Sequence, residues 1–197
     1  MALQPRENAI LALSDGTIVY GFSVGYKGIT GGELCFNTSM TGYQEIFTDP
    51  SYYGQLMMMT YPHIGNYGTM DRDDEHRKVM VAGVITRAFS YEFSNPMADS
   101  SLQQYLVDHE VVGISGVDTR ALVRHIREKG VMNAVISSDE SDPDKLVEKA
   151  KDWEPMEGLE LATRVTRKEA QTYQPEGESH YKICLLYTSP SPRDTIR

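Results

Sequence analysis

Ser51 stands at a tight turn in the most unusual stretch of this sequence, residues 36–68. The stretch is rich in Gly, Pro, Asn, Thr and Tyr, yet an apolar run, 56–59, lies in its middle. Ser51 follows Asp49 and Pro50, so a rigid turn can present its hydroxyl outward, and a hydroxyl both donates and accepts hydrogen bonds. These properties suit recognition of a small polar ligand. A serine that closes the turn or caps a helix fits the same residues, and both interpretations stay open.

Cys35 and His63 are the candidates for covalent and proton-transfer chemistry. A thiol nucleophile needs a base, an exposed turn and electropositive surroundings. Because none of these adjoins Cys35 in an expected strand, the sequence favours a buried core cysteine. A proton-transfer role for His63 is open. Because His63 has no catalytic partner near it in the sequence, the interpretation as a residue that makes a structural hydrogen bond is favoured.

The acidic run 71–76 invites a metal assignment. It lacks the glycine and the terminal glutamate spacing of a calcium loop, so a solvated loop is favoured and no metal site is assigned. The alternative is a metal-dependent hydrolase that uses His63, Asp71, Asp73 and His76. The glycines of residues 25–32 have neither phosphate-loop nor dinucleotide-loop spacing, and we expect them at hairpin and bulge positions.

Residues 118–129 carry a basic flank. Its cationic and titratable members are Arg120, Arg124, His125, Arg127 and Lys129. Part of this charge favours a helix C-terminus, and the rest can face an acidic partner surface. Nucleic acid is not expected as a partner, because the whole chain carries a net charge of −9 and phosphate binding needs clustered Lys and Arg.

The composition is typical of a soluble globular protein, with 40% hydrophobic and 24% charged residues. No apolar run approaches the roughly 18 residues of a membrane span, so we expect no membrane partner. The start of the chain has no secretory pattern, and two cysteines make no disulfide framework. A cytoplasmic protein is therefore expected.

The elements that position these residues fall into two halves. In the first, apolar runs at 9–13 and 18–24 flank an Asp-Gly pair and predict a hairpin. Further strands are expected at 33–38, 55–60 and 79–86, with a short helix at 41–47 that stops before Asp49 and Pro50.

The second half changes to helical spacing. Helices are expected at 100–109, at 118–129 and from Asp142 onward, with Asp118 and Asp142 as N-caps and Gly130 ending the middle helix. Short strands are expected at 111–114 and 131–137. Because the strands come first in the chain and the helices come later, the sequence predicts a mixed α/β (α+β) fold rather than a regular βαβ array.

The end of the chain differs in composition. Residues 158–175 are polar, and 174–179 are rich in Glu, Pro and Gly, which predicts a linker before a new element at 180–183. From Cys184 onward the sequence resembles the translation of a transposase-type sequencing adapter. We therefore expect residues 184–197 to be a read-through artefact; a natural proline-rich disordered tail is the alternative.

Several long motifs closely resemble one family. They are FNTSMTGYQE at 36–45, TDPSY at 48–52, TYPHIGN at 60–66, DGT at 15–17, and DTR to REKG at 118–130. In these motifs the chain resembles the N-terminal domain of the small, glutamine amidotransferase subunit of carbamoyl phosphate synthase. The similarity runs from about residue 9 to Ile183.

The resemblance implies a layered β/β/α domain and a known chemistry. In that family a second domain carries a Cys–His–Glu glutaminase, whose thiolate attacks the glutamine amide and releases ammonia. The large subunit uses the ammonia with bicarbonate and ATP to make carbamoyl phosphate for pyrimidines and arginine. ATP and Mg would belong to that subunit, and no cofactor is expected in this chain.

For individual residues, the resemblance implies that Ser51 matches the serine that reaches the bound glutamine. Cys35 does not match the nucleophile, so no catalytic residue is expected here and the chain alone should be inactive. The partner implied is the large subunit, with 120–129 as a candidate contact. The expected division is the N-terminal domain at 1–173, a linker and the start of the amidotransferase domain at 174–183, and the artefact at 184–197. The alternative is a stand-alone, non-catalytic interaction module.

Overall fold

The computed structural model describes residues 7–76 and 78–166, together with the single residues 168, 169, 172, 177 and 181. Apart from Gly177 and Tyr181, the expected linker at 174–183 and the expected artefact at 184–197 lie outside these residues.

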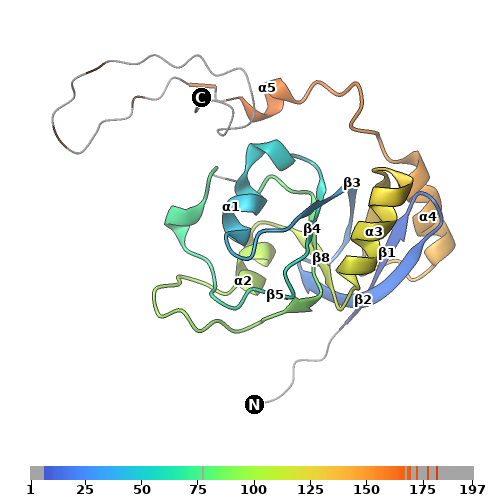
Figure 1. Cartoon of the computed structure of the whole chain (residues 1–197), viewed down its shortest axis with the longest axis horizontal. Coiled ribbons are helices and arrows are strands. Elements are labelled where there is room, and N and C mark those ends of the chain that lie inside the picture. Colours follow the sequence, from blue (N-terminus) through green and yellow to red (C-terminus); the bar gives the residue numbers. More distant parts are fainter. Residues whose placement is uncertain are drawn as a thin grey trace.

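Seven strands close into a barrel, in the order β1-β2-β8-β6-β4-β3-β9 (Figure 1). Their bounds are β1 Asn8–Leu13, β2 Ile18–Gly25, β3 Ile29–Asn37, β4 Leu56–Met59, β6 Gly83–Ile85, β8 Val112–Ser115 and β9 Asn133–Ser137. The pairs β3–β4, β4–β6 and β6–β8 are parallel, whereas β1–β2, β1–β9, β2–β8 and β3–β9 are antiparallel. The mixed α/β class expected from the sequence is confirmed, and the barrel is its specific form.

Helices and a second, two-stranded sheet surround the barrel. The helices are α1 Tyr43–Thr48, α2 Leu102–Asp108, α3 Thr119–Lys129, α4 Pro143–Asp152 and α5 Ala162–Val165, with 3-10 turns η1 Pro50–Tyr52 and η2 Asp71–Asp73. The small sheet pairs β5 His63–Ile64 with β7 Ala88–Phe89. In Figure 1, α1 and α2 lie on one side of the barrel, and α3 and α4 lie on the other. Within the described part of the chain, no helix is long and apolar enough to cross a bilayer.

The buried side chains form three clusters that follow from this arrangement. The first fills the barrel, where residues such as Leu11, Met58 and Ile114 meet Leu122 and Ile126 of α3. The second lies outside the barrel under α1 and α2, and the third lies under α4. Because β4 contributes Leu56 and Met58 to the first cluster and Met57 and Met59 to the second, it is buried on both faces. This explains its unbroken apolar run.

Local signals placed the longer helices correctly. The Asp118 side chain accepts a hydrogen bond from the Ala121 amide at 3.0 Å, and Gly130 follows the last turn of α3. The Asp142 side chain likewise accepts from the Asp144 amide at 3.1 Å, at the start of α4. Such caps satisfy amides that the first helical turn cannot pair internally, and each contributes about 1 kcal/mol.

Two expected strands begin four residues away from their predicted starts. β3 begins four residues earlier than predicted, because two glycines continue the strand. A Cβ on Gly31 would lie 2.6 Å from the Trp153 ring, and one on Gly32 would lie 2.4 Å from the Gly54 carbonyl oxygen. The expected strand at 79–86 is shorter, because the amides of Met80 and Val81 instead donate to the Phe47 carbonyl, at 2.8 and 3.3 Å. The polar region 158–175, which was expected to lead into the linker, contains α5.

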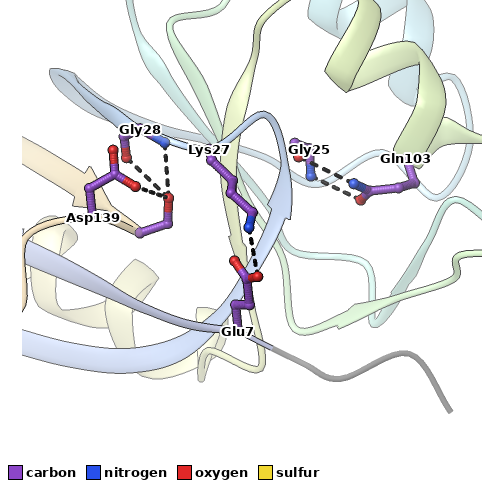
Figure 2. Close-up of polar contacts among 7 residues, drawn as sticks. Glu7, Gly25, Lys27, Gly28, Gln103 and Asp139 are labelled. Atoms are coloured by element: carbon purple, nitrogen blue, oxygen red, sulfur yellow. Dashed lines mark hydrogen bonds and ion pairs between the residues drawn. The ribbon is translucent and has the colours of Figure 1, made fainter.

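The connection between β2 and β3 is held by side chains from three other segments (Figure 2). The Gln103 carboxamide accepts from the Gly25 amide at 2.9 Å and donates to the Gly25 carbonyl at 3.2 Å. The Lys27 ammonium pairs with the Glu7 carboxylate at 2.6 Å. The Gly28 amide donates to the Ser138 hydroxyl at 2.9 Å. These contacts hold the connection between β2 and β3, which are not neighbours in the barrel.

One buried hydroxyl has no partner within the described residues, that of Thr86. A buried, unpaired hydroxyl costs about 1–3 kcal/mol. We expect Thr86→Val, which replaces the hydroxyl with a methyl group, to raise the free energy of unfolding by about 1 kcal/mol. Urea denaturation measures this change, and the paired hydroxyl of Thr30 provides the control as Thr30→Val, which should destabilise. A fall in stability for Thr86→Val would show that its hydroxyl has a partner.

Candidate functional site

The start of α1 is held by a tyrosine hydroxyl from a distant loop. Tyr67 Oη accepts hydrogen bonds from the amides of Gly42 and Tyr43, at 2.7 and 3.1 Å. The Tyr43 ring stacks on the Tyr67 ring with 4.2 Å between centroids. Gly42 has a φ of 79° and no side chain that could cap the helix. Tyr67 therefore supplies the cap that the local sequence lacks.

Gln44 ties the first turn of α1 to the loop that contains the acidic run. Its side chain is buried and pairs with both backbone groups of Met70, accepting at 2.9 Å and donating at 2.7 Å. The same amide nitrogen lies 2.6 Å from Asp74 Oδ1, which also accepts from the Tyr105 hydroxyl at 2.8 Å. One carboxylate of the acidic run thus joins α1 to α2.

Glu75 of the acidic run also contacts α1. The Glu75 amide donates to the Thr48 hydroxyl at 2.9 Å, and that hydroxyl donates to the Gln44 carbonyl at 2.9 Å. Burial raises the pKa of Glu45, and the nearby carboxylates of 73–75 add to the rise. No described group of three His, Cys, Asp or Glu side chains could hold a metal ion. These contacts give the run a structural role.

The turn that follows α1 presents Ser51. Asp49 is 8% exposed, and its Oδ1 accepts from the Ser51 amide at 2.8 Å. The amides of Tyr52 and Tyr53 complete the turn through the carbonyls of Asp49 and Pro50. The group that closes this turn is therefore the Asp49 carboxylate. Ser51 is exposed, and its hydroxyl has no hydrogen-bond partner among the residues that the structure describes.

A polar network fixes this turn to the ends of two barrel strands. Asn37, the last residue of β3, donates from Nδ2 to the Tyr52 hydroxyl at 3.1 Å. The Asn37 carbonyl accepts from both the amide and the hydroxyl of Thr60, each at 3.1 Å. Sequence reasoning did not single out Asn37, Tyr52 or Thr60. Their only signal was their place inside the FNTSMTGYQE, TDPSY and TYPHIGN motifs.

Cys35 is partly buried against the core, whereas the sequence favoured a fully buried core cysteine. It lies on β3 and packs against the cluster under α1 and α2, and its Sγ is 3.5 Å from the Leu56 carbonyl oxygen. Burial raises the pKa of the Cys35 thiol to about 12, and the nearby Glu33 carboxylate adds to the rise. At neutral pH the thiol is protonated, so it is a poor nucleophile.

His63 lies apart from this chemistry. It is exposed on β5, and the described residues offer its side chain no hydrogen bond, so the structural bond that the sequence favoured is absent there. The four residues of the hydrolase alternative do not form a metal-binding group in the described part of the molecule.

The basic flank of α3 is exposed, with one exception. Arg120, Arg124 and Arg127 are exposed and form no ion pair with any described residue. Their spacing of four and three residues places them on one helix face. His125 instead lies 2.6 Å from Asp15 Oδ2 and joins α3 to the β1–β2 hairpin. Burial acts to raise the pKa of Asp15, but hydrogen bonds from Thr17 and His125 outweigh it, so the pKa is lowered.

The comparisons with known proteins agree on one family. The family model for the carbamoyl-phosphate synthase small chain, CPSase domain, matches residues 11–136. The small chain from Aquifex aeolicus is 53% identical over 182 residues, which cover 92% of this chain and 49% of that protein. The small chain from Thermotoga maritima is 48% identical over 172 residues, covering 87% and 44%. This chain spans about half the length of the curated relatives it matches.

Removing the Tyr67 cap from α1 should lower the stability of the folded chain by a measurable amount. Tyr67→Phe keeps the ring stack with Tyr43 but leaves the amides of Gly42 and Tyr43 without their acceptor. We expect the free energy of unfolding to fall by about 1–3 kcal/mol, measured by urea denaturation. Tyr53→Phe is the matched control and should change it little, because the Tyr53 hydroxyl has no described partner. Equal effects of the two variants would contradict the assigned cap.

The raised pKa of Cys35 predicts slow alkylation. A pKa of about 12 leaves roughly a thousandfold less thiolate at pH 7 than an ordinary cysteine has. Iodoacetamide labelling of the folded chain should therefore be slow at Cys35 and should still rise about tenfold per pH unit between pH 7 and 9. Peptide mass mapping separates Cys35 from Cys184, and the urea-unfolded chain is the control. Labelling at the rate of the unfolded chain would contradict the burial of the thiol.

Proposed function

This chain belongs to the carbamoyl-phosphate synthase small-chain family, as its N-terminal domain, and we propose that it supports glutamine use by a two-subunit synthase. In this proposal the parent subunit hydrolyses glutamine in a further domain and delivers ammonia to the large subunit. The large subunit makes carbamoyl phosphate from ammonia, bicarbonate and ATP, with Mg. The domain itself contributes a contact to glutamine and a docking surface for the large subunit.

The observation that carries the glutamine role is the geometry of the turn at Ser51. The Asp49 carboxylate closes the turn, so the Ser51 hydroxyl remains available to a ligand. Tyr52, Asn37 and Thr60 hold the turn to the barrel, which limits its movement. A preorganised hydroxyl loses little entropy on binding, and this favours a direct contact with a small polar substrate.

The catalytic step is assigned to a part of the subunit outside this domain. Cys35 is the only cysteine in the described residues, and its raised pKa argues against a thiolate mechanism there. We therefore propose that the chain alone releases no ammonia from glutamine. A glutaminase activity that Cys35→Ala abolishes would overturn this.

The exposed arginines of α3 are the proposed docking surface. Arg120, Arg124 and Arg127 share one face and have no described counter-charge, so an acidic partner surface would complement them. The overall charge of −9 makes this face distinct from most of the molecule. The proposed partner is the large, synthetase subunit.

The division of the chain is also a proposal. Residues 1–173 form the N-terminal domain, with the β/β/α layering that the family resemblance implies. Residues 174–183 form the linker and the start of the amidotransferase domain, and residues 184–197 are a read-through artefact. Sequencing the uninterrupted gene tests this division. A reading frame that continues past Ile183 into a domain with a nucleophilic cysteine supports it and contradicts a stand-alone interaction module.

For glutamine, we expect Ser51→Ala in the parent subunit, assembled with its large subunit, to raise the KM for glutamine. Loss of one hydrogen bond costs about 0.5–1.5 kcal/mol, or roughly two- to tenfold in KM. With ammonia as the nitrogen source, the synthase rate should be unchanged, because the turn acts only on glutamine. Unchanged glutamine kinetics would count against the role of Ser51.

For docking, we expect Arg124→Glu to weaken association with the large subunit by about fivefold in Kd, with a smaller effect at high salt. Sedimentation or calorimetric titration of the two subunits measures this. Lys149→Glu on α4 makes the same charge change away from the proposed face and should leave Kd unaltered. If both variants weaken binding equally, the effect is one of net charge and the assigned surface is wrong.

A further inference from the structure

A cleft of about 130 Å³ lies where the barrel meets the two-stranded sheet. One wall is formed by Phe22 of β2 with Ser115 and Gly116 at the end of β8. The other wall is formed by Arg87, by β7 and by Tyr91. The Ser51 turn contributes no residue to this cleft, so its function is separate from the proposed glutamine contact.

β7 presents an unpaired backbone edge beside this cleft. Its pairing with β5 uses alternate residues, since the amides of Ala88 and Ser90 donate to the carbonyls of Pro62 and Ile64 at 3.0 and 2.8 Å. Along a strand, the residues between such pairs direct their backbone groups to the opposite edge. The amide and carbonyl of Phe89 therefore point away from β5, and no described residue pairs with them.

The direction of this free edge follows from its neighbour. The Arg87 carbonyl, two residues before Phe89, accepts from the Gly116 amide at 3.0 Å. The edge that carries the free groups of Phe89 therefore faces the end of β8. β8 ends at Ser115 and the chain then turns into α3, so the pairing stops before it reaches Phe89.

The side chains on this edge define what could fill the cleft. Arg87 precedes β7, Phe89 ends it and Tyr91 follows it, and all three line the cleft; the Phe89 and Tyr91 rings meet edge to face with 5.3 Å between centroids. Arg87 is exposed and has no described carboxylate partner. The surface thus offers one guanidinium, aromatic walls and one free pair of backbone hydrogen-bonding groups.

We propose that this cleft binds an extended, acidic peptide segment of a partner protein, which pairs with the free backbone groups of Phe89 and places a carboxylate against Arg87. Strand addition to an open edge supplies backbone hydrogen bonds, and the side-chain pocket supplies selectivity. A free small anion would use Arg87 alone and would leave the Phe89 groups unpaired. The positive charge in an otherwise acidic molecule favours an acidic segment over a basic one.

The test uses the isotope-labelled chain and a defined peptide, acetyl-Val-Glu-Val-Glu-Val-amide. The amide resonance of Phe89 should shift saturably as it acquires a hydrogen bond. Arg87→Gln should weaken binding by about fivefold, whereas Lys149→Gln, which removes one positive charge from α4, should not affect it. N-methylation of the central valine removes one backbone donor and should weaken binding by about three- to tenfold.

Three results would overturn the proposal. The first is no shift of the Phe89 amide at millimolar peptide. The second is equal affinity for a peptide with glutamine in place of both glutamates. The third is an acetate titration that reproduces the same shifts at the same concentrations, which would identify a simple anion site. These outcomes are independent of glutamine kinetics, so they do not depend on the role proposed for Ser51.

Discussion

The hydrogen bonds that Tyr67 accepts at the start of α1 are the constraint on which the segment 36–68 depends. A helix as short as α1 is not stable alone, and its N-cap glycine offers no side chain. Tyr67 caps it, Gln44 pairs with Met70, and Thr48 receives the Glu75 amide. Three contacts from one loop thus fix the helix, and the turn that carries Ser51 follows directly from its last residue.

This arrangement also explains the composition of the segment. Tyr43, Tyr67 and Gln44 supply hydrogen bonds to backbone groups that a short helix and tight turns leave unpaired. The apolar run at 56–59 is needed because β4 is buried on both faces. The segment 36–68 therefore combines turn-forming residues with the apolar run of β4. The acidic run at 71–76 belongs to the same support, since Asp74 bonds to Gln44 and Tyr105.

Sequence reasoning succeeded where the determining interactions are local. The Asp15–Gly16 hairpin, the caps of α3 and α4 and the buried β4 all rest on neighbouring residues. It could not give the barrel closure, because that depends on pairing between strands far apart in the chain, such as β1 with β9. The early start of β3 was hidden because Gly31 and Gly32 serve close packing against distant groups. For Ser51, the sequence left two interpretations, and only the geometry identified Asp49 as the group that closes the turn.

A structure of the parent subunit with glutamine and the proposed large subunit tests the role of the Ser51 turn without relying on kinetics. We expect that the Asp49–Ser51 hydrogen bond is retained and that Ser51 Oγ lies within about 3 Å of a polar atom of glutamine. We also expect Tyr67 to cap α1 in the complex. Bound glutamine with no contact from the turn at 49–53 would contradict this role.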